Sequence, residues 1–137
     1  MDLDELRRTL AAVRDGVRSG AIAGAHDVAE GGVAVALAEA CVAGGIGAEV
    51  SGAALAAAAG AVASLDAEPP LATEALFGEG VGAFVLSGDE AALRSLDCDV
   101  EIVGRVGGDA LRVGEEVEIP LAELTDAYRA GLASYFP

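Results

Sequence analysis

The side chains that can form a hydrophobic core in this chain are nearly all small. Hydrophobic residues make up 53% of the 137 positions, whereas aromatic residues make up only 4%. Alanine, valine, leucine and glycine therefore have to fill the interior, and they favour close contact between helices and a sheet. A chain of this length buries roughly 70% of its unfolded surface. We therefore expect residues 1–137 to form one domain with its own core.

The hydrophobic pattern predicts helices and strands that alternate along the chain. Leucine and valine recur at spacings of three and four between positions 3 and 17, which predicts a helix over 3–19 that ends at Gly20. Further helices are predicted over 31–43, 71–77, 89–96 and 121–135, with one or two short helices within 51–68. Strands are predicted over 22–28, 46–50, 82–87, 100–106, 111–113 and 116–119. This order indicates an α/β or α+β fold, in which helices pack on a mixed β-sheet.

The charge of the chain excludes several classes of partner. Its formal net charge is −15, from 23 acidic residues against eight basic ones, all of them arginine. Nucleic-acid binding is not expected, because neutralising phosphates needs Lys and Arg, and an anionic membrane would be repelled. No apolar run is long enough to cross a membrane, and the acidic first residues are not typical of a signal peptide. We therefore expect a cytoplasmic location.

The chain has few residues of the types that perform nucleophilic or zinc chemistry. Cys41 and Cys98 are the only cysteines, and His26 is the only histidine. This set is too small for a zinc site and excludes a catalytic triad. Cys41 falls on an alanine-rich helix and is expected in the core. Cys98 lies between Asp97 and Asp99, which should raise the pKa of its thiol.

Residues 26–39, with the sequence HDVAEGGVAVALAE, form the first candidate site. A strand end with His26 and Asp27 runs into a helix that starts at Gly31 and Gly32. Glycines let a ligand approach the backbone, a helix N-terminus favours phosphate, and one carboxylate can bind Mg²⁺. In the alternative interpretation, Asp27 and Glu30 cap the helix, the glycines permit tight packing, and His26 is a hydrogen-bonded core residue. The residues alone leave both interpretations open.

Residues 76–87, with the sequence LFGEGVGAFVLS, form the second candidate site. Three glycines within five residues precede an apolar strand, a spacing similar to that of a phosphate-binding loop. No Lys, Ser or Thr follows at P-loop spacing, and the segment does not open a helix. A structural turn is the simpler interpretation, and a ligand loop is the alternative.

Both segments resemble the phosphoribosylformylglycinamidine synthase family. Residues 26–39 are similar to the family's HDVSDGGLAVALAE signature, and 75–79 (ALFGE) are similar to its LFGES stretch. Residues 102–106 (IVGRV) resemble its IGRV strand, and 121–128 resemble its C-terminal helix. These segments follow the family's order and span most of the chain.

The resemblance implies the C-terminal domain of a longer ligase of purine biosynthesis. That enzyme converts formylglycinamide ribonucleotide to its amidine with ATP, Mg²⁺ and glutamine-derived ammonia, so upstream domains, a glutamine amidotransferase and a homodimer are the implied partners. Asp27 is the implied metal ligand at an auxiliary nucleotide site. The other implied nucleotide-binding residues are His26, Glu30, Gly31, Gly32, Glu79 and Gly80. No catalytic residue is expected, because the main catalytic and ATP-binding motifs of the family lie upstream.

The chain departs from the family pattern at several of these positions. Ala29 replaces the family's Ser, Glu30 replaces Asp before the glycines, and Gly80-Val81 replace Ser-Gln. ATP, ADP and Mg²⁺ are therefore assigned to the whole enzyme and not to this domain alone. One alternative is a non-catalytic packing or interaction module. Another is the equivalent domain of a related enzyme, such as selenide water dikinase or a hydrogenase maturation protein.

Overall fold

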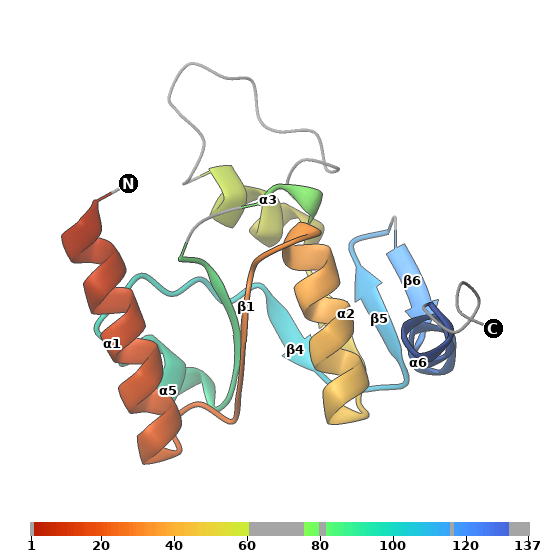
Figure 1. The fold of residues 1–137 in the computed structure, drawn as a ribbon, viewed down its shortest axis with the longest axis horizontal. Helices are drawn as coiled ribbons and strands as arrows, with labels where there is room; N and C mark the ends of the chain where they lie inside the picture. Colours follow the sequence, from red (N-terminus) through yellow and green to blue (C-terminus); the bar gives the residue numbers. More distant parts are fainter. Residues whose placement is uncertain (1, 61–75, 80–81, 116, 132–137) are drawn as a thin grey trace.

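The computed structural model describes residues 2–60, 76–79, 82–115 and 117–131. The helices in these ranges are α1 (Leu3–Ser19), α2 (Gly32–Gly44), α3 (Gly52–Gly60), α5 (Glu90–Arg94) and α6 (Leu121–Ala130). The strands are β1 (Gly24–Asp27), β2 (Ala48–Val50), β3 (Phe84–Ser87), β4 (Gly104–Val106), β5 (Ala110–Val113) and β6 (Val117–Pro120). Leu76 and Phe77 are also helical. The predicted alternation of helices and strands is confirmed, with shifted ends (Figure 1).

The strands form two sheets instead of one. β1 and β3 pair antiparallel in a two-stranded sheet. The other four lie in the order β4-β2-β5-β6, where β2 and β5 are parallel and the remaining pairs are antiparallel. This second sheet is the mixed sheet that the sequence predicts. Helix α2 contacts β1, β3 and β5, so it joins the two sheets.

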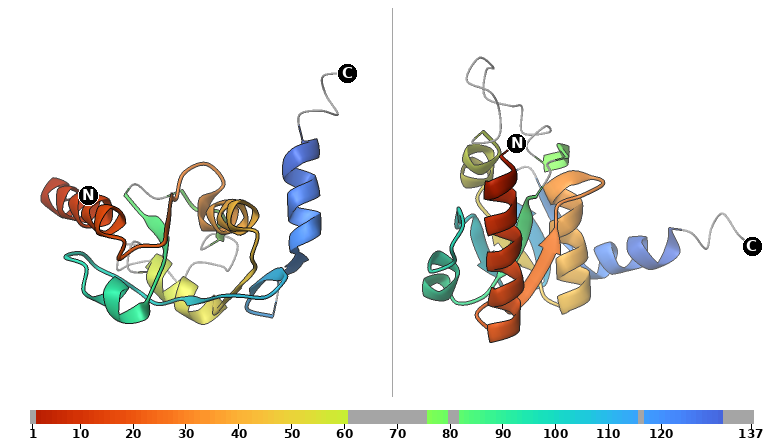
Figure 2. Two further views of the ribbon diagram at one scale, coloured as in Figure 1. Left: turned by 90° about the horizontal axis from the view of Figure 1, so that it is seen from below. Right: turned by 60° about the vertical axis from the view of Figure 1, so that its left-hand side comes forward.

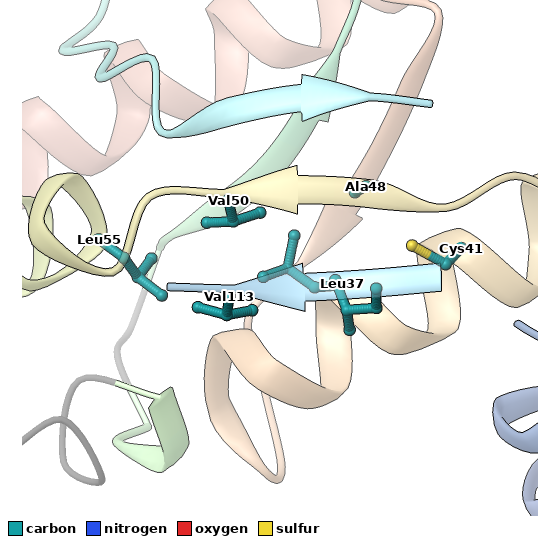
Figure 3. Packing of buried hydrophobic residues seen from close by; sticks show 7 residues of the cluster. Leu37, Cys41, Ala48, Val50, Leu55 and Val113 are labelled. Carbon is teal, nitrogen blue, oxygen red and sulfur yellow. The ribbon is translucent and has the colours of Figure 1, made fainter. Parts of the chain in front are cut away.

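The larger hydrophobic cluster lies between α2, α3 and the mixed sheet (Figure 3). Paired positions in the register share one face of a sheet, so valines and Leu111 of β2 and β5 point together toward Leu37 and Cys41 of α2. Cys41 is 5% exposed, which confirms its predicted place in the core. The buried members of the cluster are Leu37, Cys41, Ala48, Val50, Leu55, Leu111 and Val113.

The outer face of the mixed sheet has a row of alternating charges. Register places Arg105, Glu49, Arg112 and Glu118 opposite one another across all four strands. Arg112 Nη2 lies 2.7 Å from Glu118 Oε1. This row explains why the sheet buries only one face, because charged pairs on the other face stay in solvent.

A smaller hydrophobic cluster lies under α1. Val13, Ile22 and Leu93 are its buried members, and Phe84 and Leu86 of β3 pack against it. Gly16 of α1 is also buried, and a Cβ atom there would lie 2.6 Å from Ile22 Cδ1. Asp2 caps the start of α1, because its side chain accepts a hydrogen bond from the Asp4 N–H, and Gly20 caps the end with a left-handed φ of 79°.

Several predicted elements are longer than the observed ones, and the strand predicted over 100–106 differs most. The strand predicted over 100–106 pairs only from Gly104. Val100 and Ile102 pack against the smaller cluster while Val103 packs against the larger one, so this segment crosses between clusters and cannot stay in one ladder. The helix predicted over 89–96 ends at Arg94.

Parts of other predicted elements fall outside the described residues, namely 61–68, 71–75, 116 and 132–135. Within the described ranges, no helix is long and apolar enough to cross a membrane. Helix α6 extends away from the rest of the fold (Figure 2).

Candidate functional site

The first candidate segment forms a corner where β1 leads into α2. β1 is held against β3 in a register that pairs His26 with Val85 and Asp27 with Phe84. The ladder continues past the strand, because the Val28 N–H donates to the Ala83 carbonyl over 2.9 Å. The positions of His26 and Asp27 are therefore set by backbone pairing to a strand far away in the sequence.

The His26 ring is held through both of its nitrogens. Nδ1 donates to the Asp27 carbonyl over 2.7 Å. Nε2 lies 2.9 Å from Oε2 of Glu39, and the His26 side chain is 31% exposed. Two contacts on opposite sides of the ring fix its rotation. His26 is therefore a half-buried residue that joins the end of β1 to α2.

Glu39 belongs to the site and is absent from the set of residues that the sequence predicts. It is the one charged residue of α2, whose other members are alanine, valine, leucine, glycine and cysteine. The signal that could have identified it is a single carboxylate on an otherwise apolar predicted helix, which directly follows the segment with the only histidine of the chain. Its role in the structure is to orient His26.

Asp27 presents its carboxylate to solvent. Its side chain is 70% exposed, and its Oδ1 lies 3.8 Å from His26 Nδ1. The described residues contain no group of three or more His, Cys, Asp and Glu that could hold a metal ion. Asp27 alone suits Mg²⁺ only as one ligand among water and phosphate oxygens, which is how Mg²⁺ is commonly bound. A metal cage made entirely of these residues does not fit.

The two glycines at the start of α2 have different surroundings. Gly31 is the N-cap with a φ of 81°, and no side chain caps the helix. The prediction that Glu30 caps it is therefore wrong, because left-handed backbone at Gly31 starts the helix and the Gly32 N–H bonds to the Ala29 carbonyl over 3.0 Å. Gly32 has a φ of 67° and faces the backbone of the second candidate segment.

Gly32 brings the two candidate segments together. A Cβ atom at Gly32 would lie 2.7 Å from the Leu76 carbonyl oxygen and from the Phe77 carbonyl carbon. Both neighbours are backbone atoms that cannot rotate away. The predicted tight packing is therefore confirmed at Gly32, because the absence of a side chain lets the backbone of residues 76–77 approach its Cα. Leu76 packs against the larger cluster, whereas Phe77 is exposed.

The remaining predicted residues lie at the edge of this corner. Glu30 and Glu79 are both exposed. Gly80 lies outside the described residues. The structure therefore brings together His26, Asp27, Gly31 and Gly32, with Glu39 as the added member.

The two thiols take no part in this corner. Burial raises the pKa of Cys41. Burial is also the largest cause of the raised pKa of Cys98, followed by the charges of Asp99 and Asp97. The predicted direction for Cys98 is confirmed, with burial as an added cause. Cys98 lines a shallow surface pocket between α1 and residues 96–99.

Comparison with known proteins gives matches along most of the chain. Residues 1–114 match the family described as AIR synthase related protein, C-terminal domain. A phosphoribosylformylglycinamidine synthase subunit PurL from Thermomicrobium roseum is 38% identical over 96% of the chain. The same subunit from Brucella ovis is 30% identical over 98% of the chain. The chain spans only 18% and 17% of the lengths of these two relatives.

Solved structures show the same fold. Thermotoga maritima PurL in complex with AMPPCP superimposes with a TM-score of 0.65 and 21% identity, over 86% of this chain and 21% of that one. The complex of that protein with FGAR has a TM-score of 0.65 and 23% identity over 91% of this chain and 21% of that one. Because the family match covers far more than half of the sequence, this chain belongs to the family of AIR synthase related proteins, as a C-terminal domain.

Proposed function

We propose that this chain is the C-terminal domain of a phosphoribosylformylglycinamidine synthase. The carrying observation is the 38% identity to the T. roseum subunit across 96% of the chain. The whole enzyme would be an ATP-dependent ligase that forms a C–N bond in purine biosynthesis, converting FGAR to its amidine. Since the chain spans about a fifth of such a subunit, the reacting groups would lie on other domains, and this domain would be inactive alone.

Within that enzyme, the β1–α2 corner would support an auxiliary nucleotide site. T. maritima PurL has been solved with ATP, ADP and AMPPCP. Asp27 would present one carboxylate oxygen to a nucleotide-bound Mg²⁺, which neutralises phosphate charge. Glu39 would orient His26, and His26 would fix the Asp27 backbone through its carbonyl. Glu30, Gly31, Gly32, Glu79 and Gly80 complete the proposed nucleotide-binding set.

A second function is favoured by the contacts of Gly32. Its Cα faces the Leu76–Phe77 backbone, so the space beside it is filled by this chain itself. Together with Ala29, which lacks the hydroxyl of the family's Ser, this supports a domain that packs against its neighbours without binding nucleotide. Retained and lost nucleotide binding can be separated experimentally.

The proposed partners follow from the relatives. One T. maritima structure is described as PurLQS, a complex of PurL with further subunits. By analogy, this domain would work within a longer chain that meets a glutamine amidotransferase, and a homodimer is part of the same proposal. A cytoplasmic location also rests on the relationship to this enzyme.

A domain exchange tests the proposed enzyme. The corresponding C-terminal segment of T. roseum PurL would be replaced by this chain and expressed in a bacterium that lacks its own synthase subunit. Growth without added purines supports the proposal. A chimera with Gly32→Val serves as the control, because its side chain collides with the 76–77 backbone. Absence of growth with a folded, soluble unsubstituted chimera would contradict the proposal.

Nucleotide binding by the domain is tested separately with ADP and Mg²⁺. A ligand at about 100 times its Kd raises stability by about 2.7 kcal/mol, which a thermal melt detects. We expect this stabilisation in the unsubstituted chain and its loss in Asp27→Asn. A matched control is Asp126→Asn, on the exposed part of α6. An unchanged melt in the unsubstituted chain removes Asp27 from the site and favours the packing function.

A further inference from the structure

Helix α1 carries an apolar row that the domain leaves in solvent. Leu3, Leu10 and Val17 are 62%, 47% and 49% exposed. They are seven residues apart, which places them on one face with a drift of only about 20° per step. The domain uses a different face of α1, because Val13 and Gly16 are its buried residues. Single exposed leucines are ordinary, whereas three in line on one helix form a surface.

A basic row runs beside this apolar row. Arg7 follows Leu3 by four residues and Arg14 follows Leu10 by four, so each arginine lies next to a leucine of the apolar row on the helix surface. Arg18 continues the row one turn after Arg14. With Arg8, α1 holds four of the eight basic residues of the chain. Four arginines against Asp4, Glu5 and Asp15 give α1 a net charge of +1, in a chain whose total is −15.

The basic row is free to exchange its partners. Arg7 Nη1 lies 3.1 Å from Asp4 Oδ1, and Arg14 Nε lies 2.8 Å from Asp15 Oδ1. The side chains of these two arginines and of their two aspartate partners are all more than half exposed, with values from 55% to 83%. Exposed pairs of this kind are weak, so carboxylates of a partner can replace these local ones.

We propose that the exposed face of α1 is a docking site for an acidic amphipathic helix of another protein domain. Its apolar ridge would cover Leu3, Leu10 and Val17, and Asp or Glu along one edge would meet Arg7 and Arg14. Charge decides against an antiparallel pair with a second copy of α1, because pairing about Leu10 places Arg7 beside Arg14 of the other copy. Charge also decides against a basic partner at this face.

Two labelled helical peptides of the same length as α1 test the site. Both carry the same leucine ridge, and the flanking positions are Glu in one peptide and Lys in the other. Binding to the full chain is measured by fluorescence anisotropy at about 0.15 M salt, where screening beyond about 8 Å leaves the local charges dominant over the net charge. We expect the Glu peptide to bind about tenfold more tightly.

Three variants locate the binding. Leu10→Gln, which keeps a good helix former, should weaken the Glu peptide about tenfold, while Ile46→Gln should not, although Ile46 is similarly exposed at 42%. Arg7→Glu with Arg14→Glu should reverse the preference between the peptides. Circular dichroism verifies that each variant is folded, and Arg7→Gln with Arg14→Gln, which should equalise the peptides, provides a milder second test.

Several results would overturn the proposal. Tighter binding of the Lys peptide would show that the net charge of −15 of the chain, and not the arginines of α1, decides which peptide binds at this face. Equal losses in Leu10→Gln and Ile46→Gln would show binding elsewhere. Sedimentation that reveals a dimer of the chain alone, dissociated by Leu10→Gln, would assign the face to a second copy.

Discussion

The two hydrophobic clusters of this molecule differ in size and in what they hold. The larger cluster has seven buried residues in the described part of the chain, drawn from α2, α3 and two strands of the mixed sheet. The smaller cluster has three, under α1. The larger cluster joins residues from Leu37 to Val113 in sequence, so it holds most of the fold together. Helix α1 is anchored by far fewer buried side chains.

This difference separates the two proposed functional surfaces. The β1–α2 corner is attached to the larger cluster through α2, and contacts from His26 and Gly32 tie it to β3 and the 76–77 turn. It is therefore built for fixed geometry, as a ligand site or a packing joint requires. Helix α1 instead keeps an apolar row exposed. A helix with spare apolar surface and few buried contacts is suited to gain stability from a partner.

Shortening Leu37 should be the most damaging single change and tests the ranking of the clusters. Leu37→Ala opens a cavity at a residue that is 5% exposed, and such changes cost about 2–5 kcal/mol. Val13→Ala, in the smaller cluster, removes one carbon fewer and should cost roughly 1–3 kcal/mol. Urea unfolding followed by circular dichroism measures both. A larger loss in Val13→Ala would reverse the ranking.

An alanine at Gly32 should have the next largest effect and tests how tightly the corner is packed. Gly32→Ala forces a Cβ to within 2.7 Å of the Leu76 carbonyl oxygen, at a φ of 67°. Gly45→Ala is the matched control, because it has a similar φ of 63° and no neighbouring atom within 4 Å. Both carry the backbone strain, so their difference isolates the collision. We expect Gly32→Ala to lower the free energy of unfolding by about 1–3 kcal/mol more than Gly45→Ala does, as measured by urea unfolding.

The sequence was sufficient to predict the helices and strands with strong local signals. Helix α1 follows from its leucine and valine spacing and from Gly20, and α2 follows from its apolar run and the glycines at both ends. Segment 100–103 was predicted as part of a strand over 100–106. Its actual path is set by packing, because it runs from the smaller hydrophobic cluster to the larger one. The local sequence pattern does not indicate where these clusters lie.

The candidate site could be predicted in part. The His26-Asp27 end and the following glycines mark the corner, since residue types and order carry that signal. The prediction that Glu30 caps α2 was wrong. The N-cap is Gly31 in a left-handed backbone conformation, and no side chain bonds to the free N–H groups there. Glu39 and the meeting of Gly32 with Leu76 were missed. Both depend on how α2 lies against β1 and the 76–77 turn, which is a property of tertiary packing.

High pH should weaken the larger cluster through Cys41. Burial raises the pKa of this thiol above its ordinary value of 9.0. The unfolded chain therefore loses its proton first as pH rises, and the free energy of unfolding falls above about pH 9. Below that pH the contribution is fully present. Cys41→Val, which keeps an apolar side chain of similar size, should flatten the slope. An equal slope in both proteins between pH 8 and pH 10, measured by urea unfolding, would contradict this assignment.

The smallest effect is expected at Gly16, where α1 approaches the smaller cluster. A Cβ there would lie 2.6 Å from Ile22 Cδ1 and 3.1 Å from Leu96 Cδ2. Both are the ends of flexible side chains, unlike the backbone that faces Gly32, so they can turn aside. Replacing a helical glycine with alanine also stabilises a helix by about 1 kcal/mol. The cost of moving the two side chains opposes this gain in helix propensity. Gly16→Ala should therefore change the free energy of unfolding by less than about 1 kcal/mol, as measured by urea unfolding. A loss as large as that of Gly32→Ala would mean that the smaller cluster is packed as rigidly as the β1–α2 corner, and α1 would then be anchored more firmly than its few buried residues indicate.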